Sequence, residues 1–333
     1  MTAAQGDDQT LLDHATRSIT VGSKSFAAAS RLFDPATRRS AVMLYAWCRH
    51  CDDVIDGQEA GHAATPVGQD EVNQRLAALV AQTHAVFAGQ PVETEAFAAF
   101  REVVIRHRLH ETYALEHLSG FAMDVQQRDY QRIEDTLDYC YHVAGVVGLM
   151  MAQVMGVSDE QTLDRACDLG MGFQLTNIAR DIVEDAGVGR CYLPREWLDE
   201  FAIPQQHLTE PEYRAALAVL AQRLVDRAEP FYVSAEAGLT ALPWRSAWAV
   251  ATASGVYREI GIKVKQRGSK AWDTRVSTSK LDKLRLVLVG LWRAIKSRGR
   301  RWPGRPADLW QRPRHAFPAG HHAAREAGAE VSQ

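Results

Sequence analysis

Two stretches of the 333-residue chain place acidic and amide side chains at helical spacing. In the stretch RHCDDVIDG (residues 49–57), Asp52 and Asp56 are four residues apart and share one helix face, whereas Asp53 points away from it. Carboxylates this close repel one another and stay hydrated unless a positive charge lies between them. The stretch is therefore either a hydrated helix end or one half of a metal site.

The second stretch covers residues 172–185, where Asn177, Asp181 and Asp185 follow one another at intervals of four. Gln174 extends this stripe, which offers only oxygen acceptors, while apolar residues occupy the other faces. Two such helices can face each other across a bundle, where their carboxylates would repel one another in the absence of cations. Mg²⁺ prefers oxygen ligands and shares them with water and phosphate oxygens. Together the two stretches predict a metal-dependent diphosphate site.

Two arginines adjoin these acidic positions: Arg49 is one turn before Asp52, and Arg180 directly precedes Asp181. Either guanidinium could hold a diphosphate anion. Either could instead form a local ion pair with the neighbouring carboxylate, and spacing does not separate the two roles. The chemistry predicted from the residues is ionisation of a diphosphate ester in an all-α cavity, with Mg²⁺ stabilising the charge of the leaving group.

The helices that must position these motifs follow from the apolar periodicity. Apolar residues recur at intervals of three and four along most of the chain, and alternating β-branched strands with tight turns are missing from the pattern. The predicted helical runs cover residues 11–19, 38–56, 69–87, 93–109, 113–125, 133–156, 158–184 and 211–239. We predict an all-α fold, a bundle of long helices around one core.

The chain is long enough for one large domain or two ordinary ones, and the unbroken helical pattern favours one. We predict an N-terminal tail over residues 1–10 and a single all-α domain over residues 11–302. Pro, Gly, Ala, Arg and His dominate from Pro303 onward, so residues 303–333 are predicted to form a disordered tail.

Composition argues against several classes of protein. A hydrophobic content of 46% with 24% charged residues is typical of a soluble, well-cored chain, and a net charge of −3 argues against nucleic-acid binding. The odd number of cysteines, five, favours a reducing cytoplasmic location without disulfides. No apolar run approaches the roughly 18 residues of a membrane span. No strand–GxGxxG–helix pattern occurs, so we expect no NADPH.

A basic segment lies near the C-terminus. Residues 280–305 contain nine Lys or Arg and one acid, and apolar residues alternate with the basic ones. We interpret residues 280–302 as an amphipathic helix that docks on anionic lipid, which would make the protein peripherally membrane-associated. The alternative is an ordinary packed helix with a basic rim.

With these motifs in hand, the sequence resembles the squalene/phytoene synthase family, and within it the members that form phytoene. The matching stretches are GSKSF (22–26), YAWCRHCDDVID (45–56), YCYHVAGVVG (139–148) and QLTNIARDIVED (174–185), continued by GRCYLP (189–194). They occur in family order over most of residues 15–290. The resemblance implies an isoprenoid synthase fold and the head-to-head condensation of two geranylgeranyl diphosphates into phytoene.

The resemblance also implies roles for individual residues. Mg²⁺ or Mn²⁺ would be bound for one diphosphate by Asp52 and Asp56, and for the other by Asn177, Asp181 and Asp185. Positions that line the site or contact diphosphate in the family match Ser25, Phe26, Arg49, Gln174 and Arg180. Aromatic positions near the reacting carbons match Tyr139 and Tyr257, where a ring or phenol could stabilise a carbocation or orient the departing diphosphate. For Phe26 and Tyr257, packing in the core is the alternative role.

The implied reaction has two ionisations. The first gives an allylic cation that the second substrate captures, producing prephytoene diphosphate, and the second leads through rearrangement and proton loss to phytoene. We interpret the released diphosphate as the proton acceptor, because the motifs contain no dedicated base. A dry apolar cavity would protect the cations from water.

Three alternatives compete with this interpretation. A C30 synthase would make dehydrosqualene or squalene from farnesyl diphosphate, and the depth of the cavity separates it from a C40 enzyme. A non-catalytic helical assembly protein on the same fold would be expected to lose the metal carboxylates, which are intact here. A cyclising terpene synthase would lack the YCYHVAG segment. The expected partners are isoprenoid diphosphates, a membrane surface and a downstream carotenoid desaturase that receives the product.

Overall fold

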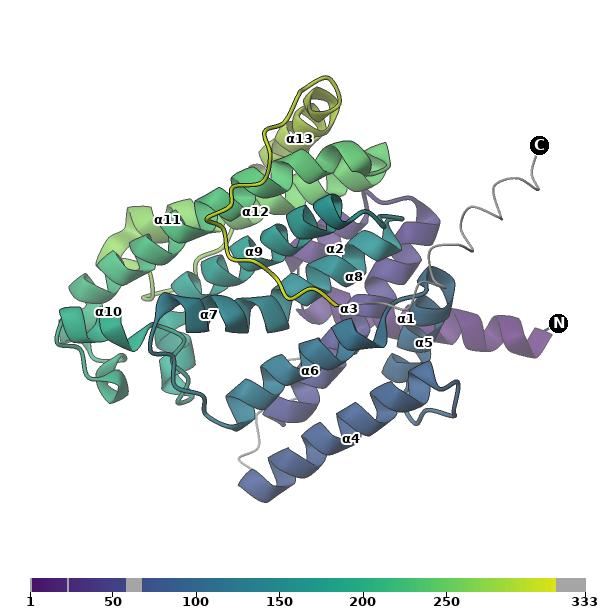
Figure 1. The fold of residues 1–333 in the computed structure, drawn as a ribbon, viewed down its shortest axis with the longest axis horizontal. Helices are drawn as coiled ribbons and strands as arrows, with labels where there is room; N and C mark the ends of the chain where they lie inside the picture. The colour runs from purple at the N-terminus through teal and green to yellow at the C-terminus, as the bar shows by residue number, and fades with distance from the viewer. Residues whose placement is uncertain (1, 23, 58–67, 316–333) are drawn as a thin grey trace.

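A computed structural model describes residues 2–22, 24–57 and 68–315 (Figure 1). These ranges form helices joined by loops and contain no β-strand, so the predicted all-α class is confirmed. The first half of the bundle consists of α1 (Thr2–Gly22), α2 (Lys24–Ser30), α3 (Pro35–Asp56), α4 (Gln69–Phe87), α5 (Glu95–His107), α6 (Glu111–Val125), α7 (Ile133–Cys140) and α8 (Val146–Val154). The second half consists of α9 (Glu160–Gly187), α10 (Arg195–Glu200), α11 (Arg214–Gly238), α12 (Trp244–Arg267) and α13 (Lys280–Ser297).

Helix α3, which carries the first acidic motif, has clear signals at both ends. Asp34 caps its N-terminus by accepting hydrogen bonds from the backbone N–H groups of Ala36 and Thr37, and Pro35 occupies the first turn. Gly57 ends the helix in the left-handed conformation, with φ of 63°. The middle of α3 is buried, with Trp47 stacked on Phe100 at 4.0 Å between ring centroids. The last turn, where Asp52 and Asp56 lie, is thus held on a well-packed stem.

Helix α9, which carries the second motif, lies in the middle of the bundle against α8, α11 and α12 (Figure 1). Asp159 caps it by accepting from the backbone N–H of Thr162 at 2.8 Å. Two glycines let α9 approach its neighbour closely. A Cβ atom at Gly170 would lie 2.2 Å from the carbonyl oxygen of Ala144, and one at Gly148 would lie 2.4 Å from that of Ala166. Glycine is needed at both positions because backbone occupies the space of a side chain.

The predicted helix over residues 133–156 is interrupted. Between α7 and α8 the chain makes a π-helical turn, η1 (Tyr141–Gly145), in which the backbone N–H of Val146 donates to the carbonyl of Tyr141. This turn is joined to α6 by a contact of 3.3 Å between the His117 ring and the His142 carbonyl. Apolar periodicity over this stretch does not reveal the extra residue, because the turn stays helical.

The two predicted tails differ from the structure. Helix α1 begins at Thr2, so the predicted N-terminal tail is helical from its second residue. The segment TAAQ at its start contains good helix formers, and α1 packs along α3 and α5.

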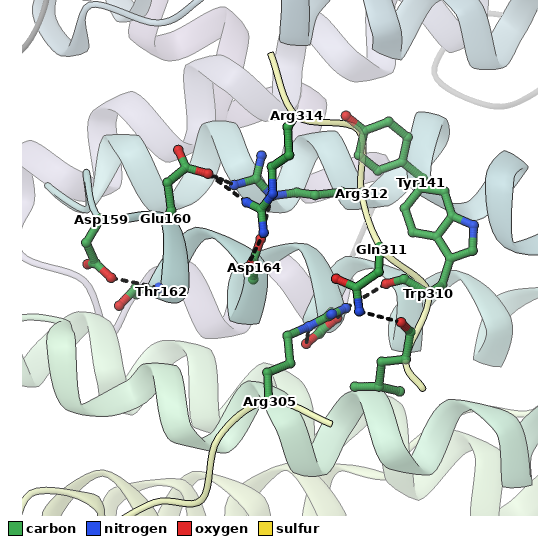
Figure 2. Close-up of polar contacts among 12 residues, drawn as sticks. Tyr141, Asp159, Glu160, Thr162, Asp164, Arg305, Trp310, Gln311, Arg312 and Arg314 are labelled. Carbon is green, nitrogen blue, oxygen red and sulfur yellow. Dashed lines mark hydrogen bonds and ion pairs between the residues drawn. The ribbon is translucent and has the colours of Figure 1, made fainter. Parts of the chain in front are cut away.

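The predicted disorder from residue 303 is wrong for residues 303–315, which we call the C-terminal strap. The strap runs across the N-terminal half of α9, where Arg305 pairs with Asp168 and Arg312 with Asp164 (Figure 2). Trp310 packs on Tyr141 with ring centroids 5.1 Å apart. Partners about 150 residues away fix this arginine-rich segment, which its composition alone does not reveal. Residues 316–333, the rest of the predicted tail, lie outside the described residues.

No helix in the described part of the chain is both long and apolar enough to cross a bilayer.

Candidate active site

A cavity of about 460 Å³ lies between α3, α8, α9 and α12. One group of polar lining residues comes from the two motifs and their surroundings and consists of Arg49, Asp52, Asp124, Tyr139, Gln174, Asn177 and Arg190. A second group contains Thr162 and Arg165. Most of the remaining lining is apolar and includes Val143, Val147, Met151, Leu169, Phe173 and Val250. The cavity therefore combines a charged region with a wall suited to hydrocarbon chains.

The first motif lies on the last turn of α3. Arg49 donates to Asp52 at 2.9 Å and to Asp53 at 2.6 Å. The local ion pair left open for Arg49 therefore forms, although Arg49 also lines the cavity. Asp53 faces Arg49. Of the three carboxylates in this motif only Asp52 lines the cavity, and of the three stripe residues in the second motif only Asn177 does. Burial raises the pKa of Asp52 to about 6, and nearby Asp56 adds to the rise while Arg49 opposes it.

The second motif lies on the C-terminal half of α9. Asn177 donates to Gln174 at 3.3 Å, whereas its own Oδ1 is buried and has no hydrogen-bond partner. Asp181 is bound by Arg180, with 2.8 Å between Nε and Oδ1, and by Arg275 at 3.2 Å. The alternative for Arg180, a local pair with Asp181, is thus also realised. Burial, followed by the charge of Asp181, raises the pKa of Asp185 to about 7.

Arg190, which follows the second motif, links the two halves. Its guanidinium pairs with Asp56, with 3.3 Å between Nη1 and Oδ2. Its positive charge also opposes the burial that raises the pKa values of Asp52, Asp124 and Asp185. Carboxylates from both motifs therefore lie within the electrostatic range of one cation, so the two acidic stretches are close together in the structure.

The donor set fits a hard divalent cation that shares its ligands with a substrate. Among the described residues, no three His, Cys, Asp or Glu side chains converge closely enough to form a complete metal cage. Mg²⁺ is usually bound by one or two carboxylates together with substrate phosphate oxygens, so a complete cage is not required. The unpartnered oxygen of Asn177 and the raised pKa values of Asp52 and Asp185 show buried oxygen atoms that a bound cation would stabilise.

The aromatic site residues both line the cavity and pack. Tyr139 stacks on Tyr192 with ring centroids 4.4 Å apart. Tyr257 stacks on Phe173 at 4.1 Å, and Phe26 on Tyr45 at 5.4 Å.

Phe26 and Tyr257 therefore both line the cavity and pack against the core, so the two roles considered for them are compatible. The side chain of Ser25 lies outside what the structure describes, so its assignment stays a prediction.

Three residues at the site carry no recognisable signal of a role in the sequence. Arg190 and Asp124 line the charged region, whereas Tyr192 contacts Asp124 without lining the cavity. Arg190 and Tyr192 belong to the stretch GRCYLP. Asp124 is a lone acid near the end of α6, and no spacing pattern marks it. The structure brings it to the motifs because α6 and the loop after α9 meet beside α7.

Comparisons with known proteins agree with this geometry. A model of the family Squalene/phytoene synthase matches residues 19–282. A phytoene synthase of Pseudescherichia vulneris is 58% identical over 303 residues, which cover 91% of this chain and 98% of that one. A 15-cis-phytoene synthase of Pantoea ananas is 57% identical over 307 residues, covering 92% and 99%.

Among solved structures, a dehydrosqualene synthase in complex with a ligand superposes with a TM-score of 0.77 at 26% identity, covering 87% of this chain and 98% of that chain. This likeness confirms the predicted isoprenoid synthase fold.

Proposed function

The chain belongs to the squalene/phytoene synthase family, and on this premise we propose that it condenses two geranylgeranyl diphosphates head to head into phytoene. The observation that carries the proposal is the identity of 57–58%, over nearly the full length of both chains, to relatives named phytoene synthase. The cavity supports it, because its lining combines charged residues suited to diphosphates with apolar residues suited to hydrocarbon chains.

Divalent metal is part of this proposal. Mg²⁺ or Mn²⁺ would be held by Asp52 and Asp56 on one side and by Asn177, Asp181 and Asp185 on the other, together with diphosphate oxygens. A bound divalent ion supplies positive charge that stabilises the departing diphosphate.

The arginines act on the same groups. Arg49, Arg180 and Arg190 are each paired with a motif carboxylate. With a metal ion bound to those carboxylates, the guanidiniums would be available to bind diphosphate oxygens, for which their planar donors are well suited.

The rest of the cavity protects the cationic intermediates. Tyr139 lines the same cavity as Val143 and Val147, so its ring and oxygen can contact an allylic cation held there. The apolar wall excludes water, which would otherwise capture the first cation before it forms prephytoene diphosphate and the second before rearrangement and proton loss give phytoene.

The test is incubation of the full chain with Mg²⁺ and either geranylgeranyl or farnesyl diphosphate, without NADPH, followed by product identification. We expect a C40 triene from geranylgeranyl diphosphate, with the cis bond that the name of the Pantoea ananas relative specifies. A C30 product from farnesyl diphosphate alone would favour the C30 alternative. Failure to convert either substrate would contradict the enzymatic assignment.

We further propose that α13 docks on an anionic membrane surface and delivers the apolar product there, from which a desaturase could take it. One face of α13 packs on α12 through Leu286, Gly290 and Ala294. The opposite face exposes an apolar stripe, 58% to 78% exposed, made of Leu281, Leu284, Leu288, Trp292 and Ile295. Lys296 lies over the Trp292 ring at 4.5 Å, which places a cation beside the stripe. Apolar residues flanked by cations fit an anionic bilayer interface.

Vesicle co-sedimentation tests the docking. Replacing Leu284, Leu288 and Trp292 together by Ser should abolish binding to vesicles that contain phosphatidylglycerol, because the change removes most of the exposed apolar stripe. The buried face of α13 is unchanged, so the helix should keep its packing on α12. Ile105→Ser, a change to another exposed apolar side chain, is the matched control and should bind like the wild type. Equal binding by the triple variant and the control would contradict the docking proposal.

A further inference from the structure

The carboxylate of Asp124 lies between two tyrosine hydroxyls. Tyr139 donates to its Oδ2 at 3.1 Å, and Tyr192 donates to its Oδ1 at 3.0 Å. The two phenol rings stack, and Tyr130 packs edge-on against both. One lone acid at the end of α6 thus joins α7 to the loop that follows α9.

This arrangement determines the direction of the Tyr139 hydroxyl. Burial raises the pKa of Tyr139 well above its usual value, so the phenol stays protonated. A phenol has a single proton to donate. Because that proton is directed to Asp124, the negative end of the hydroxyl dipole is left for other contacts. Tyr139 and Asp124 both line the cavity, so a cation in the cavity can approach the lone pairs that this hydrogen bond leaves free.

The geometry points to Asp124 as the positioning residue that turns the lone pairs of the Tyr139 oxygen toward the carbocations formed in the cavity. The inference rests on the proposed function. It also separates the two roles considered for Tyr139, because a hydroxyl that donates to Asp124 cannot donate to a departing diphosphate. Tyr139 therefore acts by stabilising positive charge, and Asp124 keeps its oxygen aimed and close.

Tyr192 provides a matched comparison on the same carboxylate. It donates to Asp124 at nearly the same distance as Tyr139, and the two rings are stacked. Tyr192 is absent from the residues that line the cavity, however. Loss of its hydroxyl removes one hydrogen bond from Asp124 without removing an oxygen from the reaction site.

The test is a double-mutant cycle on the full chain with Mg²⁺ and geranylgeranyl diphosphate. Asp124→Asn keeps the shape and one oxygen acceptor but loses the charge that fixes the hydroxyl direction. We expect it to lower kcat by about 10- to 100-fold and to leave KM within about threefold. Tyr139→Phe should lower kcat at least as much. The double variant should fall no more than about twofold below Tyr139→Phe, because both changes remove the same interaction.

Tyr192→Phe should keep kcat within about threefold of the wild type. If the double variant lost kcat by the product of the two single losses, the inference would be overturned. A loss of kcat in Tyr192→Phe equal to that in Asp124→Asn would also overturn it. If Asp124→Asn unfolds below the assay temperature, Asp124→Glu, which keeps the charge but moves the oxygens, replaces it in the cycle with the same expectation. A wild-type chain that forms no phytoene would contradict the proposed function, whereas the cycle, run on whichever diphosphate the chain converts, would still decide the role of Asp124.

Discussion

Helix α9 carries two stripes with the same spacing, and they have opposite surroundings. Glu160, Asp164 and Asp168 lie on its N-terminal half, and Asn177, Asp181 and Asp185 on its C-terminal half, each at intervals of four residues. Seventeen residues separate corresponding positions, which rotates the second stripe by roughly a quarter turn around the helix. The first stripe faces the strap, whereas the second is turned away from the strap and contributes Asn177 to the lining of the cavity.

The difference lies in the positive charge each stripe receives. Arg305, Arg312 and Arg314 of the strap pair with all three acids of the first stripe (Figure 2). In the second stripe Asp181 pairs with Arg180 and Arg275, but Asn177 has an unpartnered oxygen and Asp185 forms no ion pair with another described residue. Spacing on a helix therefore does not distinguish a structural stripe from a ligand stripe, and the supply of counter-charge does.

The largest expected contrast is in turnover. Asp181→Ala should abolish phytoene formation, a loss of at least about ten-thousandfold, which corresponds to about 5 kcal/mol of activation free energy. Helix content by circular dichroism should stay nearly unchanged, and Asp52→Ala should behave alike. Asp164→Ala, the corresponding change in the first stripe, should keep turnover per folded molecule. Equal turnover in the Asp164 and Asp181 variants would remove the distinction between the stripes.

The second contrast is in stability. The side chain of Asp168 is 1% exposed, and Arg305 contacts both of its oxygens, at 2.9 and 2.7 Å. Arg305→Ala leaves a buried carboxylate without its partner, so the free energy of unfolding in urea should fall by about 3–5 kcal/mol. Turnover per folded molecule at low temperature should be retained. A loss below about 1 kcal/mol would show that the strap is not a stabilising element.

The third contrast depends on pH. The folded-state pKa of Asp185 is about 7, above the ordinary value near 3.9 of an unfolded chain. The folded protein therefore holds a proton that the unfolded chain releases, so this contribution to stability is present at low pH and is lost as pH rises toward 7. Between pH 5 and 7.5 in EDTA, the free energy of unfolding should fall by about 1–3 kcal/mol more in the wild type than in Asp185→Asn.

Addition of Mg²⁺ at pH 7.5 should restore stability in the wild type, because metal binding compensates the ionised carboxylates. Identical pH slopes in the wild type and Asp185→Asn would contradict the raised pKa of Asp185.

The smallest expected effect lies within the strap itself. Arg314 pairs with Glu160 and Asp164, both at 2.7 Å, but its side chain is 53% exposed. Exposed pairs contribute little, so Arg314→Ala should lower the free energy of unfolding by about 0.2–1 kcal/mol. If Arg314→Ala lowered the free energy of unfolding as much as Arg305→Ala does, burial would not determine how much each ion pair of the strap contributes to stability.

Local features of the sequence were sufficient for much of the fold and for half of the site. The periodicity that buries one face of α3 and α9 also places Asp52 beside Asp56 and Asp181 beside Asp185, because both follow from 3.6 residues per turn. Features that depend on distant partners could not be predicted in this way. Arg305 pairs with Asp168, which lies 137 residues away, and Asp124 accepts hydrogen bonds from two tyrosines of other elements.

The π-helical turn η1 has a consequence for how this chain tolerates changes in length. One residue more than an α-helical turn is inserted between α7 and α8. Deleting a residue from 141–145 would let the helix close as a regular α-helix and would rotate one half relative to the other by about 100°. Tyr139 and Val147 could then no longer face the same cavity. Substitutions in this turn change one side chain, whereas a single deletion would change the orientation of a whole wall.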